Sequence, residues 1–203
     1  KPREISTKAI KQTIRDYANS AKLAQDAGYD GCEIMGSEGY FLNQFLVEHV
    51  NKRQDEWGGS VANRMRLPVE VVRAVREAVG PNFIIVYRLS MLDLVPDGQT
   101  FDEVITLAKE LEKAGVTIIN TGIGWHEAKI PTIATMVPRG AFTWVTRKVK
   151  EAVSIPVSAS NRINMPSHAE EIIASGDADM ISMARPMLAD PDWVNKAAAN
   201  KEE

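Results

Sequence analysis

The chain has 203 residues, of which 44% are hydrophobic and 25% charged, as is typical of a globular protein with a sizeable core. Its formal net charge of −3 argues against nucleic acid or an anionic membrane surface as the main partner. Nothing in the sequence resembles a signal peptide or an apolar stretch of transmembrane length, so we expect a soluble, cytoplasmic protein without membrane association.

Helical patterns alternate with short apolar runs along the whole chain. The first helix is predicted from Ser6 or Thr7 to Gly28, and further helices at 60–79, 100–114, 142–153 and 167–176. Apolar runs with β-branched residues follow the helix ends, at 31–35, 83–89, 117–121, 155–159 and 179–183. Because these runs lack strict alternation, they are predicted to be parallel strands covered on both faces. The order predicts an α/β fold with one continuous parallel sheet and a single domain.

Titratable side chains follow two of the predicted strands. Glu38 and Tyr40 lie directly after the first strand, in a glycine-flanked turn, and His126 follows the third. Ligands of parallel α/β proteins bind beyond the carboxyl ends of strands. A phenol there can deliver a proton to a developing carbanion, and a carboxylate can position it. His126 is either a solvated loop residue or a group that polarises a substrate.

Three arginines occupy positions that indicate an anionic ligand. Arg88 lies inside the apolar run 83–89, where a buried guanidinium requires either an internal salt bridge, for example to Glu33, or an anionic ligand. Arg162 and Arg185 follow the last two predicted strands, where they can form a phosphate clamp or ordinary surface ion pairs. The only cysteine, Cys32, cannot form an internal disulfide and is interpreted as a small buried hydrophobe.

Three segments resemble the flavin-dependent barrel enzymes of the Old Yellow Enzyme class: AGYDGCEIMGSEGYFLNQFL, NKRQDEWGGSVANR and GIGWHEAKIPTIAT. That class usually carries two histidines in the first segment, where this chain has Met35 and Glu38, but Tyr40 is kept. MGSEGY and GIGWHEAKIPTIAT are similar to the bacterial, NADPH-dependent 2,4-dienoyl-CoA reductases. The resemblance covers almost the whole chain, and the second segment is interpreted as a structural loop at the barrel mouth.

The resemblance implies a (β/α)8 TIM barrel, present here as a fragment that covers roughly strands four to eight. A complete barrel typically needs about 250 residues. Residues 1–203 would form a partial FMN-binding barrel domain. The first three strands, the iron–sulfur cysteines and the C-terminal FAD and NADPH domain would lie outside it, in the remainder of the parent polypeptide.

The resemblance also implies an activity, the reduction of a 2,4-dienoyl-CoA thioester in fatty acid β-oxidation. Hydride would come from reduced FMN, and electrons from NADPH through FAD and an iron–sulfur cluster outside this chain. Tyr40 would supply the proton, assisted by His126 and oriented by Glu38. The implied FMN-binding residues are Arg88, Arg162, Met183, Ala184 and Arg185. The implied residues that bind the acyl-CoA substrate are Glu127, Ala128, Lys129 and Ile130. No metal site is expected.

Two alternatives stay open at this point. The first is an ene-reductase of the same class that acts on a small enone and takes electrons directly from NADPH. The second is a catalytically incompetent barrel fragment. An amine dehydrogenase is disfavoured, because nothing in the sequence resembles an aromatic cage for a quaternary amine.

Overall fold

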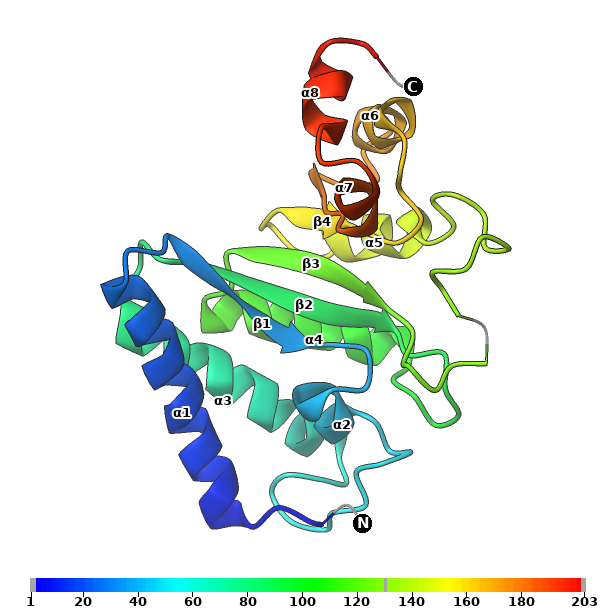
Figure 1. The fold of residues 1–203 in the computed structure, drawn as a ribbon. Helices are drawn as coiled ribbons and strands as arrows, with labels where there is room; N and C mark the ends of the chain where they lie inside the picture. Colours follow the sequence, from blue (N-terminus) through cyan, green and yellow to red (C-terminus); the bar gives the residue numbers. More distant parts are fainter. Residues whose placement is uncertain (1–2, 130, 202–203) are drawn as a thin grey trace.

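A computed structural model describes residues 3–129 and 131–201 of the chain (Figure 1). The strands are β1 (Gly31–Gly36), β2 (Ile84–Leu92), β3 (Ile118–Ile123), β4 (Val157–Ala159) and β5 (Met180–Ile181). The helices are α1 (Thr7–Asp26), α2 (Phe41–Leu46), α3 (Val61–Val79), α4 (Phe101–Ala114), α5 (Thr143–Lys150), α6 (Pro166–Ala174), α7 (Arg185–Ala189) and α8 (Trp193–Ala198).

The five strands form one sheet in the order β1-β2-β3-β4-β5, and every neighbouring pair is parallel. The predicted parallel α/β sheet is therefore confirmed. The register places Met35 opposite Arg88 and Arg88 opposite Asn120, across the first three strands. Because all strands run the same way, their carboxyl ends meet at one edge of the sheet, which is where parallel sheets bind ligands.

Local signals explain where the three longest helices, α1, α3 and α4, begin. The Ser6 hydroxyl accepts a hydrogen bond from the Ala9 N–H at the start of α1. Thr100 and Glu103 form the predicted capping box of α4. The structure differs from the prediction in two respects: β4 and β5 are only three and two residues long, and α2, α7 and α8 were not predicted. These three helices have five or six residues, too few to show a helical period in the sequence.

The main core lies between the first three strands and the helices α1, α3 and α4, which cover one side of the sheet in Figure 1. Fully buried side chains such as Leu107, Leu111 and Ile85 fill it. Tyr87 is also completely buried, and a Cβ atom on Gly36 would lie 2.1 Å from its hydroxyl oxygen. Glycine at position 36 therefore leaves room for the ring. Burial raises the pKa of Tyr87 far above its ordinary value, so the phenol stays neutral.

The loop before α3 is fixed by Arg64, whose side chain is almost completely buried. Its guanidinium pairs with Glu48 at 2.7 Å and Glu103 at 2.5 Å. It also donates to the backbone carbonyls of Leu46 at 2.8 Å and Gly59 at 2.7 Å. One buried cation thus ties α2, the loop, α3 and α4 together, so this segment has a structural role.

The C-terminal part has a separate and much smaller core of Ala159, Ile163, Ile172 and Ala178, whereas Val157 at the start of β4 still packs in the main core. Figure 1 shows β4 and the helices α5 to α8 at one end of the molecule, beyond β3. In the part of the chain that the structure describes, no helix combines the length and apolarity that crossing a membrane requires.

Candidate active site

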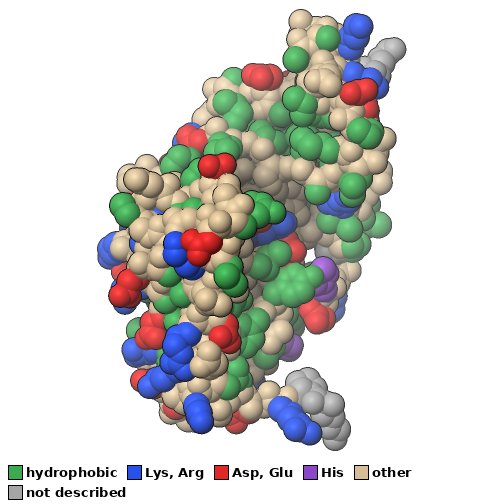
Figure 2. Space-filling view, turned by 60° about the vertical axis from the view of Figure 1, so that its left-hand side comes forward, with side chains coloured by type: hydrophobic (Ala, Val, Ile, Leu, Met, Phe, Trp, Pro, Cys, Tyr) green, Lys and Arg blue, Asp and Glu red, His purple; other side chains and the backbone are tan. Residues whose placement is uncertain are grey.

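A cavity of about 1020 Å3 opens at the carboxyl ends of the strands. Every strand or the loop after it contributes to its wall, through residues that include Glu38, Arg88, Asn120, Ser160 and Ser182. Figure 2 shows the molecule hollowed between its larger lower part and the C-terminal helices. The cavity lies where the parallel sheet predicts a ligand site.

Tyr40 and His126 meet at the rim of this cavity. The Tyr40 hydroxyl lies 2.9 Å from Nε2 of His126, and the two rings stand edge to face at 82° with 5.3 Å between their centroids. Tyr40 precedes α2, His126 follows β3, and both side chains are exposed. The structure therefore brings together the phenol and the imidazole that the sequence placed after two different strands. A hydrogen-bonded pair of this kind can hold and transfer a proton.

Glu38 forms an ion pair with Arg88, with 2.7 Å between Oε1 and Nη2. The sequence had suggested Glu33 as the internal partner of Arg88, but Glu33 instead accepts a hydrogen bond from Asn120 Nδ2 at 2.7 Å. Glu38 has a φ of 63°, in the left-handed region that non-glycine residues avoid. Such strained residues concentrate at functional sites, and here the strain turns a carboxylate toward the cavity.

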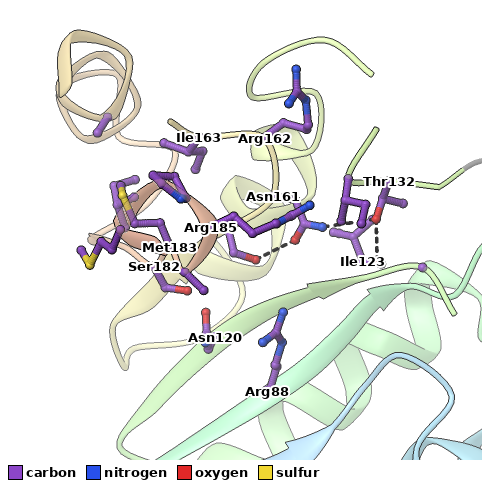
Figure 3. Close-up of a pocket in the computed structure, with 18 of the residues that line it drawn as sticks. Arg88, Asn120, Ile123, Thr132, Asn161, Arg162, Ile163, Ser182, Met183 and Arg185 are labelled. Carbon is purple, nitrogen blue, oxygen red and sulfur yellow. Dashed lines mark hydrogen bonds between the residues drawn. The ribbon is translucent and has the colours of Figure 1, made fainter. Parts of the chain in front are cut away.

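Two buried polar atoms of the cavity wall have no hydrogen-bond partner among the described residues, Arg88 Nε and Asn120 Oδ1. Arg88 and Asn120 are neighbours in register on β2 and β3, and Figure 3 shows both side chains pointing from the sheet toward the C-terminal segment. One atom is a donor and the other an acceptor, so together they suit a polar ligand edge that offers both. Asn120 was not predicted as a site residue, because its only signal in the sequence is that it is polar and lies within an apolar strand.

Arg162 and Arg185 both line the cavity, and the Arg162 side chain is also bonded to the backbone. Arg162 Nε donates to the Val137 carbonyl at 2.8 Å, and in Figure 3 the side chain points away from Arg88. Asn161 and Arg162 have φ values of 71° and 59°, so the backbone after β4 turns sharply. Met183 and Ala184, after β5, line the same wall as Arg185.

The predicted substrate-binding residues divide into two groups. Ala128 lines the cavity, whereas Glu127 and Lys129 are exposed and are not part of its wall. The Ala128 N–H bonds to the Trp125 carbonyl, and this turn leaves the flanking charged side chains in solvent. Ile130 lies outside the described residues. Apolar Pro131 and Ile133 line the cavity and were not predicted.

A buried carboxylate that the sequence did not single out is hydrogen-bonded to the segments that carry Tyr40 and His126. Asp93, just after β2, is only 3% exposed. Its Oδ1 accepts hydrogen bonds from Asn43 Nδ2, Ser90 Oγ and Trp125 Nε1, and its Oδ2 accepts two from Gln99. An aspartate at a strand end ordinarily suggests a solvated residue, so no sequence signal marked its burial.

Comparison with known proteins identifies the family of the chain. The chain matches the NADH:flavin oxidoreductase / NADH oxidase family over residues 1–203. It is 44% identical to a "Metal reductase" of Desulforamulus reducens over 100% of this chain and 30% of that protein. It is 36% identical to an "NADH oxidase" of Thermoanaerobacter brockii, over 99% of this chain and 31% of that protein.

A solved structure described as a 2-naphthoyl-CoA reductase in complex with 2-naphthoyl-CoA superposes with a TM-score of 0.96 at 32% identity. The superposition covers 98% of this chain and 31% of that chain. The chain thus spans about 30% of the length of these relatives, and its sheet corresponds to part of the TIM barrel of flavin oxidoreductases. The chain belongs to the NADH:flavin oxidoreductase / NADH oxidase family.

Proposed function

We propose that this chain forms part of an FMN-dependent reductase that acts on a conjugated 2,4-dienoyl-CoA thioester. The observation that carries the proposal is the 2.9 Å hydrogen bond between Tyr40 and His126 at the rim of the cavity. A proton-donating pair beside a large cavity with polar and apolar walls suits the reduction of an activated double bond, which needs a hydride on one carbon and a proton on another. The superposed structure named for a CoA thioester supports the same substrate class.

The cavity wall fits FMN. Arg88 Nε and Asn120 Oδ1, both buried and without a described partner, offer a donor and an acceptor to the pyrimidine edge of the ring. We assign the phosphate to Arg162, Arg185 and the segment that contains Met183 and Ala184, because guanidinium groups bind phosphate well. When bound and reduced, FMN supplies the hydride.

Tyr40 donates the proton in this mechanism. The phenol proton passes from the Tyr40 oxygen to the carbon of the substrate enolate, and an O–H bond breaks as a C–H bond forms. A phenol has an ordinary pKa near 10 and is a weak acid at neutral pH. The His126 imidazole, bonded through Nε2, stabilises the negative charge that develops on the phenol oxygen. General acid catalysis of this kind is typically worth about 10²–10⁴-fold in rate.

Glu38 acts mainly through Arg88 in this proposal. Glu38 forms an ion pair with Arg88, so it holds the guanidinium in place and influences the Tyr40–His126 pair through its charge. On the substrate side, Ala128 together with Pro131 and Ile133 provides an apolar wall for the acyl chain. Glu127 and Lys129, exposed beside it, are assigned to the outer part of the CoA ester, and the assignment of Ile130 to the substrate stays a proposal from the sequence.

Electron supply is the second part of the proposal. We infer that NADPH delivers electrons through FAD and an iron–sulfur cluster held by flanking parts of the polypeptide. The rival is an ene-reductase that acts on a small enone with direct reduction by NADPH. Cysteines with iron–sulfur spacing encoded after residue 203 would favour the first, and a yellow purified protein would exclude the incompetent fragment.

The test uses the flavin-loaded protein with whatever flanking sequence its gene encodes. The flavin is reduced chemically without oxygen and mixed rapidly with 2,4-hexadienoyl-CoA or with cyclohexenone. We expect faster reoxidation by the thioester, and a Tyr40→Phe variant that retains its flavin but reoxidises about 10²–10⁴-fold more slowly. Reoxidation of Tyr40→Phe at the wild-type rate would refute the proton-donor assignment. Faster reoxidation by cyclohexenone than by 2,4-hexadienoyl-CoA would refute the thioester as the substrate.

A further inference from the structure

We propose that the buried carboxylate of Asp93 is a positioning residue that sets the geometry of the Tyr40–His126 pair. The inference rests on the proposed function of that pair, and among the described residues Asp93 forms its hydrogen bonds with neighbours of the pair. What links them is a set of hydrogen bonds that runs from one carboxylate to both of the loops that carry the pair.

The first branch leads to Tyr40. Asp93 Oδ1 accepts a hydrogen bond from Asn43 Nδ2 at 3.1 Å. The other end of the same amide, Asn43 Oδ1, accepts from the Gly39 N–H at 2.9 Å. The Gly39 carbonyl in turn accepts from Gln44 Nε2 at 2.7 Å. Both backbone groups of Gly39, the residue before Tyr40, are therefore hydrogen-bonded. Its N–H is bonded to Asn43, which is fully buried and is itself bonded to Asp93.

The second branch leads to His126. Asp93 Oδ1 also accepts from the indole Nε1 of Trp125 at 3.0 Å, and the Trp125 N–H donates to the Asp93 backbone carbonyl at 2.9 Å. The residue before His126 is thus bonded to Asp93 through both its side chain and its backbone. Trp125 is buried, so these bonds are shielded from water.

The two branches also touch each other directly. A Cβ atom on Gly39 would lie 2.8 Å from Cε3 of the Trp125 ring, and Gly39 has a φ of 83°. Glycine at this position lets the turn after β1 lie flat against the indole. Hydrogen bonds to the carboxylate and this close contact together leave little freedom for the separation between Tyr40 and His126.

The chemistry of Asp93 suits this role better than a neutral residue would. Among the described residues, every donor to its carboxylate is neutral. These donors are the Asn43 amide, the Ser90 hydroxyl, the Trp125 indole N–H, and the backbone N–H and side-chain amide of Gln99. A carboxylate accepts more hydrogen bonds than any neutral side chain, and bonds to a charged acceptor are the stronger ones. A misplacement of about 1 Å in a reacting group can cost about 10²-fold in rate. Hydrogen bonds that hold Tyr40 and His126 at the right separation would therefore keep the reaction fast.

The decisive variant is Trp125→Phe, which removes the Nε1–H donor and keeps a ring against Gly39. Its matched control is Trp57→Phe, because Trp57 is also buried and its Nε1 has no hydrogen-bond partner among the described residues. Both variants are made in the flavin-loaded protein, alone and combined with Tyr40→Phe. Asp93→Asn, which keeps the shape and loses acceptor capacity opposite the Gln99 donors, serves as a second variant.

Two readouts are measured: reoxidation of reduced flavin by 2,4-hexadienoyl-CoA, and the 15N NMR signals of the His126 imidazole, assigned with His126→Ala. We expect Trp125→Phe to slow reoxidation about tenfold or more with flavin content unchanged, but by less than about twofold when Tyr40→Phe is already present. The His126 Nε2 signal should move in Trp125→Phe and Asp93→Asn and stay in place in Trp57→Phe.

An equal slowing by Trp125→Phe in both backgrounds, or no slowing at all, overturns the positioning role while the proton-donor assignment stands. If Tyr40→Phe alone reoxidises at the wild-type rate, the proposed function fails instead. In that case the NMR comparison still decides the structural half of the inference: an unmoved His126 signal in Trp125→Phe and Asp93→Asn would overturn it.

Discussion

The candidate site joins two regions of the molecule that are packed very differently. The region around β1, β2 and β3 has a large core, with Leu107, Leu111 and Ile85 fully buried. The C-terminal region from β4 onwards has a core of four small or medium side chains. It also exposes apolar residues, among them Leu188 at 81% and Val194 at 55%, and Figure 2 shows hydrophobic side chains gathered there.

This difference separates two tasks. The proposed proton-donor pair, Tyr40 and His126, lies at the edge of the well-packed region, where hydrogen bonds connect the residues before it to the buried Asp93. The residues assigned to the phosphate lie in the region with few buried contacts, where local opening is expected to require less free energy. Ligand binding across both regions should stabilise the weaker one, because a ligand that binds only the folded form shifts the equilibrium toward it.

The largest effect is expected from Arg64→Met, which tests what holds the well-packed region. The change leaves Glu103 without its guanidinium and removes the link between α2, α3 and α4. Breaking a buried ion pair by removing one partner typically costs about 3–5 kcal/mol. Urea unfolding should show this loss. Arg66→Met breaks a partly exposed ion pair to Glu70 at 4.0 Å and should change stability by less than about 1 kcal/mol.

A second comparison sets one buried aliphatic residue of each region against the other. Leu111→Ala and Ile172→Ala remove similar side chains that are 0% and 4% exposed. We expect Leu111→Ala in the upper part of the typical range of about 2–5 kcal/mol, and Ile172→Ala near or below its lower end, because a small core collapses more easily around lost volume. Hydrogen exchange should show global destabilisation in the first and faster exchange confined to residues after 157 in the second. Equal, global effects of both changes would contradict the division into two regions.

A third prediction concerns flavin binding in the C-terminal region. Arg185→Ala should weaken FMN binding about tenfold or more, since a hydrogen bond to a charged group is typically worth about 1.5–3 kcal/mol. Arg162→Ala should weaken it as well, but also free the Val137 carbonyl that Arg162 Nε now binds. Flavin titration followed by fluorescence measures both. Arg139→Ala is the matched control, because Arg139 is exposed and does not line the cavity.

The smallest effect is a pH dependence at the junction of the two regions. Partial burial tends to raise the pKa of Asp179, but hydrogen bonds from Lys150 and the Val157 N–H, with the charge of Lys150, outweigh this and hold the pKa below its ordinary value. A carboxyl with a lowered folded pKa contributes stability above its unfolded pKa, and that contribution is lost as pH falls through the folded value. Exchange in the C-terminal region, measured relative to the intrinsic exchange rate at each pH, should therefore accelerate below about pH 4.

Asp179→Asn should remove this acceleration and loosen the junction already at neutral pH. Glu170→Gln, an exposed change of the same charge on α6, should leave it in place. Hydrogen exchange between pH 3 and pH 6 measures both variants, with residues after 157 compared against α4. An acceleration that persists in Asp179→Asn would assign the pH dependence to other groups.

The sequence predicted the fold where local signals decide it. β-Branched runs and helix caps such as Thr100 predicted where the strands and most of the longer helices lie in the chain, because these features depend on a few neighbouring residues. The lengths of β4 and β5 could not be predicted, since ladder pairing depends on the partner strand. Both were expected to be five residues long and are shorter.

The same division holds in the site. The strand-end rule was enough to place Tyr40 and His126 at one mouth, because it follows from the direction of parallel strands. The partner of Arg88 was not predictable, because Glu38 reaches it only through a left-handed backbone at position 38. Asp93 was missed for a related reason: its burial exists only after α2 and the loops at Gln99 and Trp125 have closed around it.

The register of the sheet also sets an order of events during folding. Gly31 of β1 pairs with Ile84, and Ile119 of β3 pairs with Val157, so each ladder joins segments that a whole helix separates in the chain. The entropy of closing such loops must be overcome before the first contact across them forms, which slows the folding of parallel sheets. Helices with strong local caps, such as α4, can form on a much shorter timescale. We therefore expect the turn at Gly39 and the indole of Trp125 to meet late in folding, after β2 has paired with both of their strands.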